Sequence, residues 1–477
     1  MSGTSGFKHF LPQCIATLLG TLMAVSDGMT YGWTSPMIPY LTGNQTHIPV
    51  TIEDTEWLET IVLFGAATGL PFTILGVNYL GRKVCMIISA FVGSICWTIL
   101  LTTHSVTLVF VARFFQGMAG DMCFVAAPMY IAEIAEPKIR GFLSATIYLM
   151  MLTGILLVYS VGAYAPYVCV PIVGMVLCLT QVVLFPLMPE SPYYLIYQNK
   201  KENAKKSLVR LRGKGMDIEE EIADMEKAVE RQKTEKGRLQ DLFLIKSNRR
   251  GMMIMTILNG TQHFVGISVM LMNLHIILNE AGSVYLDTSV AAIIFAVFML
   301  IAATIASMII DKFGRKILLI ISAILTGIIL LIIAVYFHLK NLHYDVISIS
   351  WIPAVGVMIY AATFKFGLGL VPIVVTAEVF PTTIKAIGMT FADVVYVIAS
   401  IISIFIYSAL YNNYGMHMPF YLFGCWSFVT VFFVYFCVPE TKGKSLDEIQ
   451  LMLKGGGKEE AGKVYNNVPI VERVDTV

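Results

Sequence analysis

Four charged side chains of this sequence are expected to lie within the hydrocarbon of a membrane, where they could hold an ion, a proton or a polar solute. They are Asp27, Asp121, Lys365 and Asp393. Insertion scales put the cost of a charge at the bilayer centre at about 2.5–3.5 kcal/mol, so each should face a cavity or a partner. We expect Lys365 to face a central cavity and to pair with Asp27 or Asp393, either as a structural ion pair or to neutralise a bound anion. A proton-coupled role for Asp27 is an alternative.

A second set of charges recurs at matching places in the two halves of the chain. Glu133 precedes Arg140 by seven residues. Glu378 precedes Lys385 by the same spacing. Seven residues make about two helical turns, which carry opposite charges from a helix end into the following loop. If each half of the chain forms a helical bundle, ion pairs at these places can hold the two bundles together in one conformation and separate in the other. We therefore predict that these charges form a gate on the cytoplasmic side of a membrane protein. Its members are Arg82, Glu133, Arg140, Glu190, Arg315, Glu378, Lys385 and Glu440.

The turns that carry these charges are also repeated. Residues 78–83 read Asn-Tyr-Leu-Gly-Arg-Lys and residues 311–316 read Asp-Lys-Phe-Gly-Arg-Lys. Likewise, 189–191 read Pro-Glu-Ser and 439–441 read Pro-Glu-Thr. Each turn is too charged and glycine-rich to lie in hydrocarbon, yet it is flanked by stretches long enough to cross it. The repeats therefore indicate a duplicated membrane protein.

Composition agrees with this interpretation, because 57% of the 477 residues are hydrophobic and only 14% are charged. A soluble chain would carry about a quarter charged residues. Runs of about 20 apolar residues are long enough to span a bilayer. Twelve such stretches occur, at 11–34, 57–79, 84–103, 107–132, 141–163, 167–188, 252–278, 288–310, 316–338, 350–377, 386–411 and 418–438.

The predicted fold class is therefore an all-α membrane protein with twelve transmembrane helices in two six-helix bundles. Residues 1–191 are expected to form the N-terminal bundle and 251–440 the C-terminal bundle, with a cytoplasmic tail at 441–477. Residues 192–250 are rich in Lys, Arg and Glu. Helical spacing within this segment predicts a cytoplasmic linker of amphipathic helices on the membrane surface, with a solvated linker as the alternative.

Loop charge predicts the orientation, because cytoplasmic loops retain Lys and Arg. The basic loops and the linker fall on one side, which places both termini in the cytoplasm. The longest loop on the other side, 37–55, contains the sequon Asn44-Gln-Thr46, so Asn44 is a candidate for glycosylation. We expect an integral protein of the plasma membrane.

Other classes of function lack their sequence signatures. The chain has no Gly-rich phosphate loop with its lysine, no nucleophile with a positioned base and no His and Cys at metal-ligand spacing. No basic run is interleaved with aromatic residues, as a nucleic-acid groove would need. We therefore expect no enzyme activity, cofactor, metal or nucleic-acid partner. The expected partners are the lipid bilayer and a small-molecule solute.

Several motifs along almost the whole chain resemble a known family. They are Arg113-x-x-x-Gly117, Pro128-Met-Tyr-Ile-Ala-Glu133 with Pro137 and Arg140-Gly141, Pro189-Glu-Ser-Pro192, the 311–316 turn, and Pro439-Glu-Thr-Lys-Gly-Lys444. Together they resemble the sugar porter family of the major facilitator superfamily. The run from Gly28 to Pro36 is similar to the insect facilitated trehalose transporter-like group. The resemblance implies a central site near the bilayer midplane and rocking-type alternating access.

The positions of the implied site differ from the residues usual in the family. Gln262 and Gly266 share a helix face one turn apart, and His263 beside them is a candidate hydrogen-bond donor, with a pH sensor as the alternative. The helix 5 glutamine falls on Tyr148, and the helix 11 asparagine falls on Tyr396. The implied substrate-binding set is Gln262, His263, Ser268, Phe364, Lys365, Tyr148, Ile373 and Tyr396.

A sugar needs many polar partners, because a buried hydroxyl left unpaired costs about 1–3 kcal/mol. This set supplies fewer than is usual in the family. The sequence nevertheless favours a transmembrane transporter of a small polar solute, a sugar such as trehalose or a hexose, working by facilitative alternating access. The alternatives are a carrier of a polyol or an organic anion, and a transporter-like nutrient sensor.

Overall fold

The computed structural model describes residues 3–44, 46–213, 218–234, 240–380, 384–444 and 446–454, and these residues are almost entirely helical. The side chain of Lys385 lies outside what the structure describes. Twelve helical segments of the described chain are long and apolar enough to cross a membrane. The predicted fold class is therefore confirmed.

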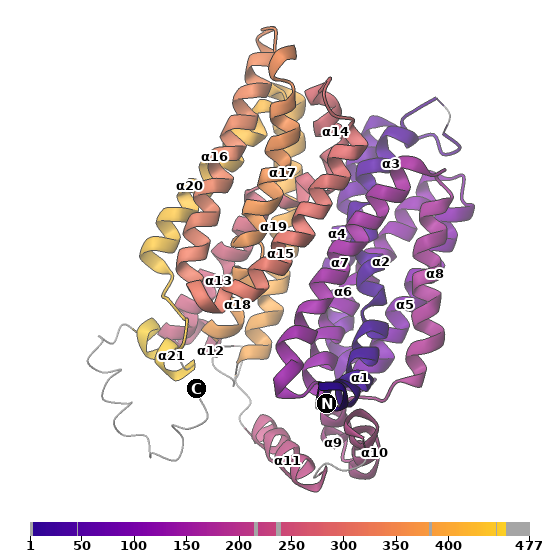
Figure 1. The fold of residues 1–477 in the computed structure, drawn as a ribbon, viewed down its shortest axis with the longest axis vertical. Helices are drawn as coiled ribbons and strands as arrows, with labels where there is room; N and C mark the ends of the chain where they lie inside the picture. The colour runs from indigo at the N-terminus through magenta and orange to yellow at the C-terminus, as the bar shows by residue number, and fades with distance from the viewer. Residues whose placement is uncertain are drawn as a thin grey trace.

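The N-terminal bundle contains six of these crossings (Figure 1). The first crossing combines consecutive helices, because the chain bends near Thr21 and Trp33. The helices are α1 (Gly3–Gly20), α2 (Leu22–Gly32), α3 (Thr34–Leu41), α4 (Ile52–Tyr79), α5 (Arg82–Thr102), α6 (Val106–Ile134), α7 (Pro137–Tyr164), α8 (Cys169–Leu184) and the short η1 (Phe185–Leu187).

The linker and the C-terminal bundle follow. The linker helices are α9 (Pro192–Tyr197), α10 (Lys201–Arg212), α11 (Ile218–Thr234) and α12 (Asp241–Leu244). The C-terminal helices are α13 (Lys246–Phe264), α14 (Ile267–Ala281), α15 (Thr288–Phe313), α16 (Arg315–Asn341), η2 (Ile347–Ile349), α17 (Trp351–Phe366), α18 (Val371–Val379), α19 (Lys385–Tyr414), α20 (His417–Cys437) and α21 (Leu446–Lys454).

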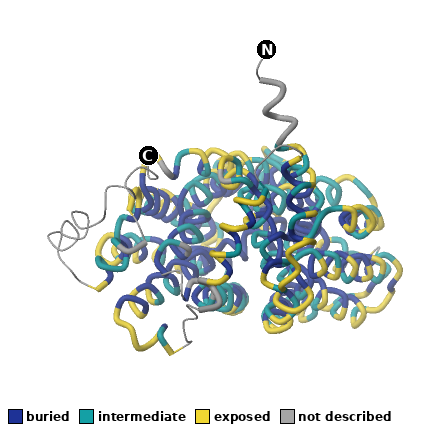
Figure 2. Tube along the Cα trace, turned by 90° about the horizontal axis from the view of Figure 1, so that it is seen from below, coloured by how far each residue is buried: buried dark blue, intermediate teal, exposed yellow. Residues whose placement is uncertain are grey.

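The two bundles stand side by side with the linker helices at one end (Figure 1). Contacts between the bundles are made by α7 with α15, by α4 with α19, and by α14 with both α2 and α3. Seen from the linker end, buried positions lie inside the bundles and exposed positions lie mainly at the periphery (Figure 2). We call the end that carries the linker the inner end and the opposite end the outer end.

The repeated turns are built in the same way in both bundles. Gly81 precedes α5 with a φ of 98° and Gly314 precedes α16 with a φ of 88°, a left-handed backbone that favours glycine. A Cβ on Gly81 would lie 2.7 Å from Oε2 of Glu190, and one on Gly314 would lie 2.8 Å from Oε2 of Glu440. Each glycine therefore lets a glutamate approach the first turn of the following helix.

The linker helices have a small core of their own, which differs from the expected membrane-surface helices. Ile222, Met225 and Val229 of α11 are buried in one cluster with residues of α9 and α10, including Ile196 and Leu208. The apolar face of α11 is thus covered by neighbouring linker helices. The predicted linker helices form, but periodicity alone does not say which apolar surface a helix face meets.

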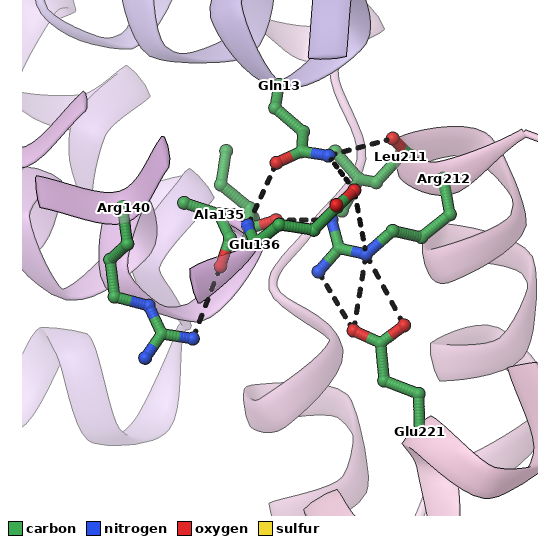
Figure 3. A network of polar contacts seen from close by, with 8 residues as sticks. Gln13, Ala135, Glu136, Arg140, Leu211, Arg212 and Glu221 are labelled. Atoms are coloured by element: carbon green, nitrogen blue, oxygen red, sulfur yellow. Dashed lines mark hydrogen bonds and ion pairs between the residues drawn. The ribbon is translucent and has the colours of Figure 1, made fainter. Parts of the chain in front are cut away.

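A buried arginine attaches this linker to the N-terminal bundle (Figure 3). The Arg212 side chain is 2% exposed, and its guanidinium binds Glu221 of α11 at 2.9 Å and the backbone oxygen of Ile134 at 2.8 Å. Its Nε also lies 3.7 Å from Glu136. Gln13 of α1 donates to Glu136 Oε1 at 2.7 Å and accepts from its backbone N–H at 3.0 Å. The linker, α1 and the end of α6 therefore meet in one polar network.

We predict that Arg212→Ala will detach the linker from the N-terminal bundle. Removing one partner of a buried ion pair commonly costs about 3–5 kcal/mol, because the remaining charges stay buried. Purified protein should lose thermal stability, and the linker should be cut faster in limited proteolysis. The control is Lys201→Ala, which removes a linker ion pair whose lysine is 56% exposed. Equal effects of the two changes would contradict the anchoring role of Arg212.

Candidate functional site

The seventh crossing is broken in its middle, and the break exposes backbone and polar side chains to the interior. Between α13 and α14, Gly266 adopts a φ of 92°, and a Cβ there would lie 2.8 Å from the ring of Phe423. The Tyr360 hydroxyl donates to the backbone oxygen of Val265 at 3.1 Å, and the backbone N–H of Gly266 donates to His263 at 2.8 Å. Irregular backbone at membrane depth is tolerated where the protein satisfies it in this way.

The tenth crossing is broken as well, between α17 and α18. The Ser322 hydroxyl of α16 donates to the backbone oxygen of Thr363 at 2.6 Å and accepts from the backbone N–H of Leu368 at 2.9 Å. The backbone N–H of Gly369 donates to Phe364 at 2.8 Å. Paired discontinuous helices of this kind mark the binding sites of many secondary transporters.

Polar side chains at the first break hydrogen-bond to one another, and some of their nitrogen atoms have no hydrogen-bond partner among the described residues. His263 Nδ1 lies 2.7 Å from the hydroxyl of Ser268, which lies 2.7 Å from the hydroxyl of Ser400 on α19. Gln262 is 3% exposed and His263 is 1% exposed. Among the described residues, neither Nε2 of Gln262 nor Nε2 of His263 has a hydrogen-bond partner. Both atoms are therefore candidates for contact with a solute.

Residues of the two bundles converge next to this break. The rings of His263 and Tyr396 meet edge to face with centroids 4.1 Å apart. Tyr396 lies close enough to Asp27 and Asp393 to interact electrostatically with both, and Tyr148 interacts in the same way with Asp393 and Tyr396. We call the resulting group the central cluster. Its members are Asp27, Tyr31, Asp121, Tyr148, His263, Asp393 and Tyr396.

The three acids of the central cluster have different surroundings. Asp27 is 2% exposed, and one of its oxygens occupies the space that a Cβ on Gly120 would need. Asp121 is half-buried and accepts from the Thr73 hydroxyl at 3.2 Å. Asp393 on α19 is half-buried as well. Acids from both bundles therefore face one central region.

Arg113 is the cation near these acids. It is fully buried, its guanidinium lies 5.0 Å from the Trp33 ring, and it donates to the backbone oxygens of Thr30 at 2.6 Å and Leu58 at 3.3 Å. It also interacts electrostatically with Asp27. Arg113 therefore joins α6 to α2 and α4 and offsets part of the acidic charge.

The expected ion pair of Lys365 with Asp27 or Asp393 is not formed. Among the described residues, no carboxylate lies within ion-pair distance of Lys365, whose Nζ lies 5.8 Å from the ring centroid of Phe364. The charge is instead held against an aromatic face, which attracts cations. The prediction was wrong because the positive charge near the acids is supplied by Arg113, which lies closer to Asp27 in the fold.

The remaining members of the predicted substrate set are less central. Phe364 is 1% exposed and stacks on Tyr360 with centroids 5.6 Å apart, so it packs within the C-terminal bundle in this conformation. Ile373 in α18 is half-buried. The structure brings Tyr148, His263 and Tyr396 together with the acids, and places Gln262 and Ser268 next to them.

At the inner end, the predicted gate residues pair within each bundle. Arg82 binds Glu133 at 2.7 Å, and Arg315 binds Glu378 at 2.8 Å. Arg140 donates to the backbone oxygen of Ala135 at 3.2 Å. The two arginine pairs occupy equivalent places in the repeat, but both partners of each pair belong to one bundle, so in this conformation they do not join the two bundles.

The two glutamates after the sixth and twelfth crossings accept backbone hydrogen bonds at equivalent places. Glu190 accepts from the backbone N–H of Lys83 at 3.1 Å, and Glu440 accepts from that of Lys316 at 3.1 Å. Burial raises the pKa of Glu190. Burial also acts to raise the pKa of Glu440, but backbone N–H groups, including those of Lys442 and Lys316, outweigh it and hold this pKa below its ordinary value. The carboxyl group of Glu440 therefore ionises at a lower pH than that of Glu190.

At the outer end, hydrogen bonds join the two bundles. The Ser35 hydroxyl lies 2.7 Å from His275 Nδ1 and accepts from the backbone N–H of His275 at 3.0 Å. Tyr159 donates to the backbone oxygen of Leu271 at 2.6 Å, and Thr34 donates to that of Met272 at 3.2 Å. We call this set of contacts the outer seam.

Two glutamates of α4 extend the outer seam. Asn273 donates to Glu59 Oε2 at 2.8 Å, in a contact between side chains that are each at most 5% exposed. Glu56 accepts from Ser408 at 2.5 Å and from Asn412 at 2.9 Å. Every hydrogen bond that joins the two bundles within the described chain lies in this outer half. The molecule is thus closed at the outer end.

Four further residues near the site were not predicted as site residues: Glu59, Arg113, Gln116 and Asn273. Gln116 is 1% exposed, and neither atom of its amide has a hydrogen-bond partner among the described residues. Glu59 and Arg113 both fall inside stretches predicted to span the membrane. The rule that a charge in such a stretch needs a partner could therefore have found both, whereas nothing local distinguishes Asn273 or Gln116.

Two helical bundles, two broken crossings and a polar centre define a membrane carrier with a site between its halves. A family model described as "Sugar (and other) transporter" matches residues 13–453. The chain is 31% identical over 457 residues to the facilitated trehalose transporter Tret1 of Bombyx mori, covering 94% of this chain and 89% of the relative. The chain belongs to this sugar transporter family, so it is a transporter and not an enzyme.

Two further relatives and one solved structure are similar to this chain, over different shares of their own length. The Tret1 protein of Apis mellifera ligustica is 30% identical, with 94% of this chain and 89% of the relative covered. The chain spans 51% of the longer Tret1 protein of Drosophila mojavensis. The inward open structure of the xylose transporter XylE from E. coli superimposes with a TM-score of 0.76 at 22% identity, covering 92% of this chain and 99% of that chain. This last similarity shows the same fold.

We predict that Asn273→Ala will loosen the outer seam. The change leaves the buried Glu59 carboxylate without this donor, which costs about 1–3 kcal/mol in the closed state. Spin labels placed at the exposed Thr42 and Asn413, with Cys425 and Cys437 replaced by Ser, should report a larger population of long distances.

The matched control is Asn279→Ala in the same helix. The Asn279 side chain accepts from Thr288 of its own bundle, so the label distances should stay unchanged. If Asn273→Ala also leaves the distances unchanged, the Glu59–Asn273 contact does not help to hold the outer end closed.

Proposed function

We propose that this transporter carries a sugar, trehalose or a hexose, across the membrane by facilitative alternating access. The observation that carries the proposal is the central cluster, in which residues of both bundles lie within electrostatic range of one another beside a broken crossing. A site between two bundles can be open to either side in turn as the bundles rock. Family membership and the trehalose transporters among the relatives add support.

The chemistry of the cluster suits a neutral solute with many hydroxyl groups. Carboxylates accept hydrogen bonds, phenolic hydroxyls both donate and accept, and the unpaired amide nitrogen of Gln262 donates. The ring of Tyr396, which packs against His263, adds apolar surface for the C–H face of a sugar. The members of the central cluster include three acids and no lysine or arginine, so the cluster offers an anion no cationic partner and the organic-anion alternative is disfavoured.

We further propose that the inner end faces the cytoplasm of a plasma-membrane protein, as the distribution of Lys and Arg predicts. Both termini would then be cytoplasmic, and the closed outer seam would make this an inward-facing state. Asn44 is exposed in the outer loop, which suits a glycan there. The inner ion pairs would act as the proposed gate by bracing each bundle, and the charged rims would meet when the cytoplasmic side closes.

Uptake into vesicles that contain only the purified protein tests this function. Labelled trehalose or glucose should enter saturably and stop at equal concentrations on the two sides. An imposed proton gradient should drive no accumulation, because the proposed mechanism is facilitative. Accumulation driven by protons would overturn the facilitative mechanism. Uptake of organic anions or polyols with none of the sugars would overturn the sugar assignment, and binding without any uptake would favour a sensor.

We predict that Gln262→Ala will weaken binding of the transported sugar by about 1–3 kcal/mol, because one hydroxyl of the sugar loses its partner. The dissociation constant can be measured by calorimetry with the sugar that the uptake assay identifies. The control is Gln181→Ala, because Gln181 is also buried but bonds Met23 and Met86 within the N-terminal bundle. That control should lower thermal stability and leave the dissociation constant unchanged. A Gln262→Ala protein with unaltered affinity would place the site elsewhere.

A further inference from the structure

A groove on the inner membrane boundary lies outside the transport site. It has a volume of about 300 Å³ and is bordered by the middle of α1, the chain after η1 and the end of α10. Its lining is apolar except for one arginine. The lining residues are Leu11, Pro12, Ile15, Met188, Pro189, Arg210 and Leu211.

The position of the groove sets which molecules can reach it. The first membrane crossing begins at Phe10 and the sixth ends at Leu187, so the groove lies where hydrocarbon meets the headgroup region. Leu11, Ile15 and Leu18 follow one another at helical spacing and are 44%, 40% and 47% exposed. They form a lipid-facing stripe that runs from the groove into the membrane.

The charge at the groove is positive and incompletely neutralised. Arg210 is exposed and has no ion-pair partner among the described residues. Lys83 interacts electrostatically with Arg210 and donates to the backbone oxygen of Pro186 at 2.7 Å, next to the groove. The nearby acid, Glu190, already accepts the backbone N–H groups of Lys83 and Ser191. Lys83 also interacts electrostatically with Glu190, so Arg210 is the cation that an anion at the groove mouth would meet first.

We propose that this groove binds an anionic glycerophospholipid of the inner-end leaflet. The phosphate lies at Arg210, whose planar guanidinium can bind two phosphate oxygens, and one acyl chain follows Leu11, Ile15 and Leu18. Charge complementarity favours an anionic over a zwitterionic lipid. In the proposed orientation this leaflet is cytoplasmic, where anionic lipids are enriched. The bound lipid would join α1 to the docked linker through α10.

Native mass spectrometry of protein extracted from bilayers of phosphatidylcholine with phosphatidylglycerol tests the proposal. The wild type should retain phosphatidylglycerol in preference to phosphatidylcholine. Arg210→Gln should lower that retention about fivefold, the factor that corresponds to about 1 kcal/mol for one basic residue near a membrane surface. Ile15→Trp should lower it as well, by filling the apolar part of the groove while Arg210 remains.

The matched control is Arg249→Gln, which removes an exposed charge near the inner start of α13 and away from the groove. It should leave retention unchanged, and Arg210→Lys should preserve most of it. The proposal is overturned if Arg210→Gln binds as the wild type does, or if Arg249→Gln loses as much lipid, which would mean general surface attraction. Equal retention of phosphatidylcholine would also overturn it, as would displacement of the lipid by inorganic phosphate. If Arg210→Gln fails to fold, normal retention in Ile15→Trp decides against the proposal.

Discussion

Every backbone N–H and C=O that crosses the bilayer must find its partner inside the protein, and the transport site depends on how this constraint is met. The chain interrupts two crossings, at Gly266 and at 367–370, in the interior where neighbouring helices supply the missing partners. At the first break the Tyr360 hydroxyl donates to the backbone oxygen of Val265. At the second break the Ser322 hydroxyl bonds to backbone groups on both sides of the interruption. The irregular backbone is thus tolerated where neighbouring helices satisfy it, and the first break lies beside the central cluster.

The two ends of the molecule are held by different interactions. At the inner end, Arg82–Glu133 and Arg315–Glu378 each close within one bundle, so rocking of the bundles leaves both pairs intact. At the outer end, hydrogen bonds such as Glu59–Asn273 join the bundles and must break when that end opens. A typical hydrogen bond contributes only about 0.5–1.5 kcal/mol net, because water replaces the lost partner. The outer seam is therefore suited to opening and closing repeatedly.

The sequence predicted the crossings and the repeated turns well, because hydropathy and the spacing of glycine, arginine and glutamate are local properties. It predicted less where distant segments meet. Lys365 was expected to pair with an acid, yet the acids share a region with Arg113 instead. Ile222 of α11 was expected at the membrane surface but packs within the linker. Asn273 and its partner Glu59 are separated by 214 residues, and only the docking of the bundles brings them together.

The departures from the usual family residues need not remove the capacity to bind a sugar. By the resemblance of the sequence, Tyr148 and Tyr396 are expected to replace amides usual in the family, and a phenol offers one donor and one acceptor where an amide offers more. The acids beside them, Asp121 and Asp393, restore acceptors to the same region from opposite bundles. Because one acid comes from each bundle, a solute that donates hydroxyls to both would draw the bundles together. Binding and closure of the inner end would then be coupled through the solute itself, as alternating access requires.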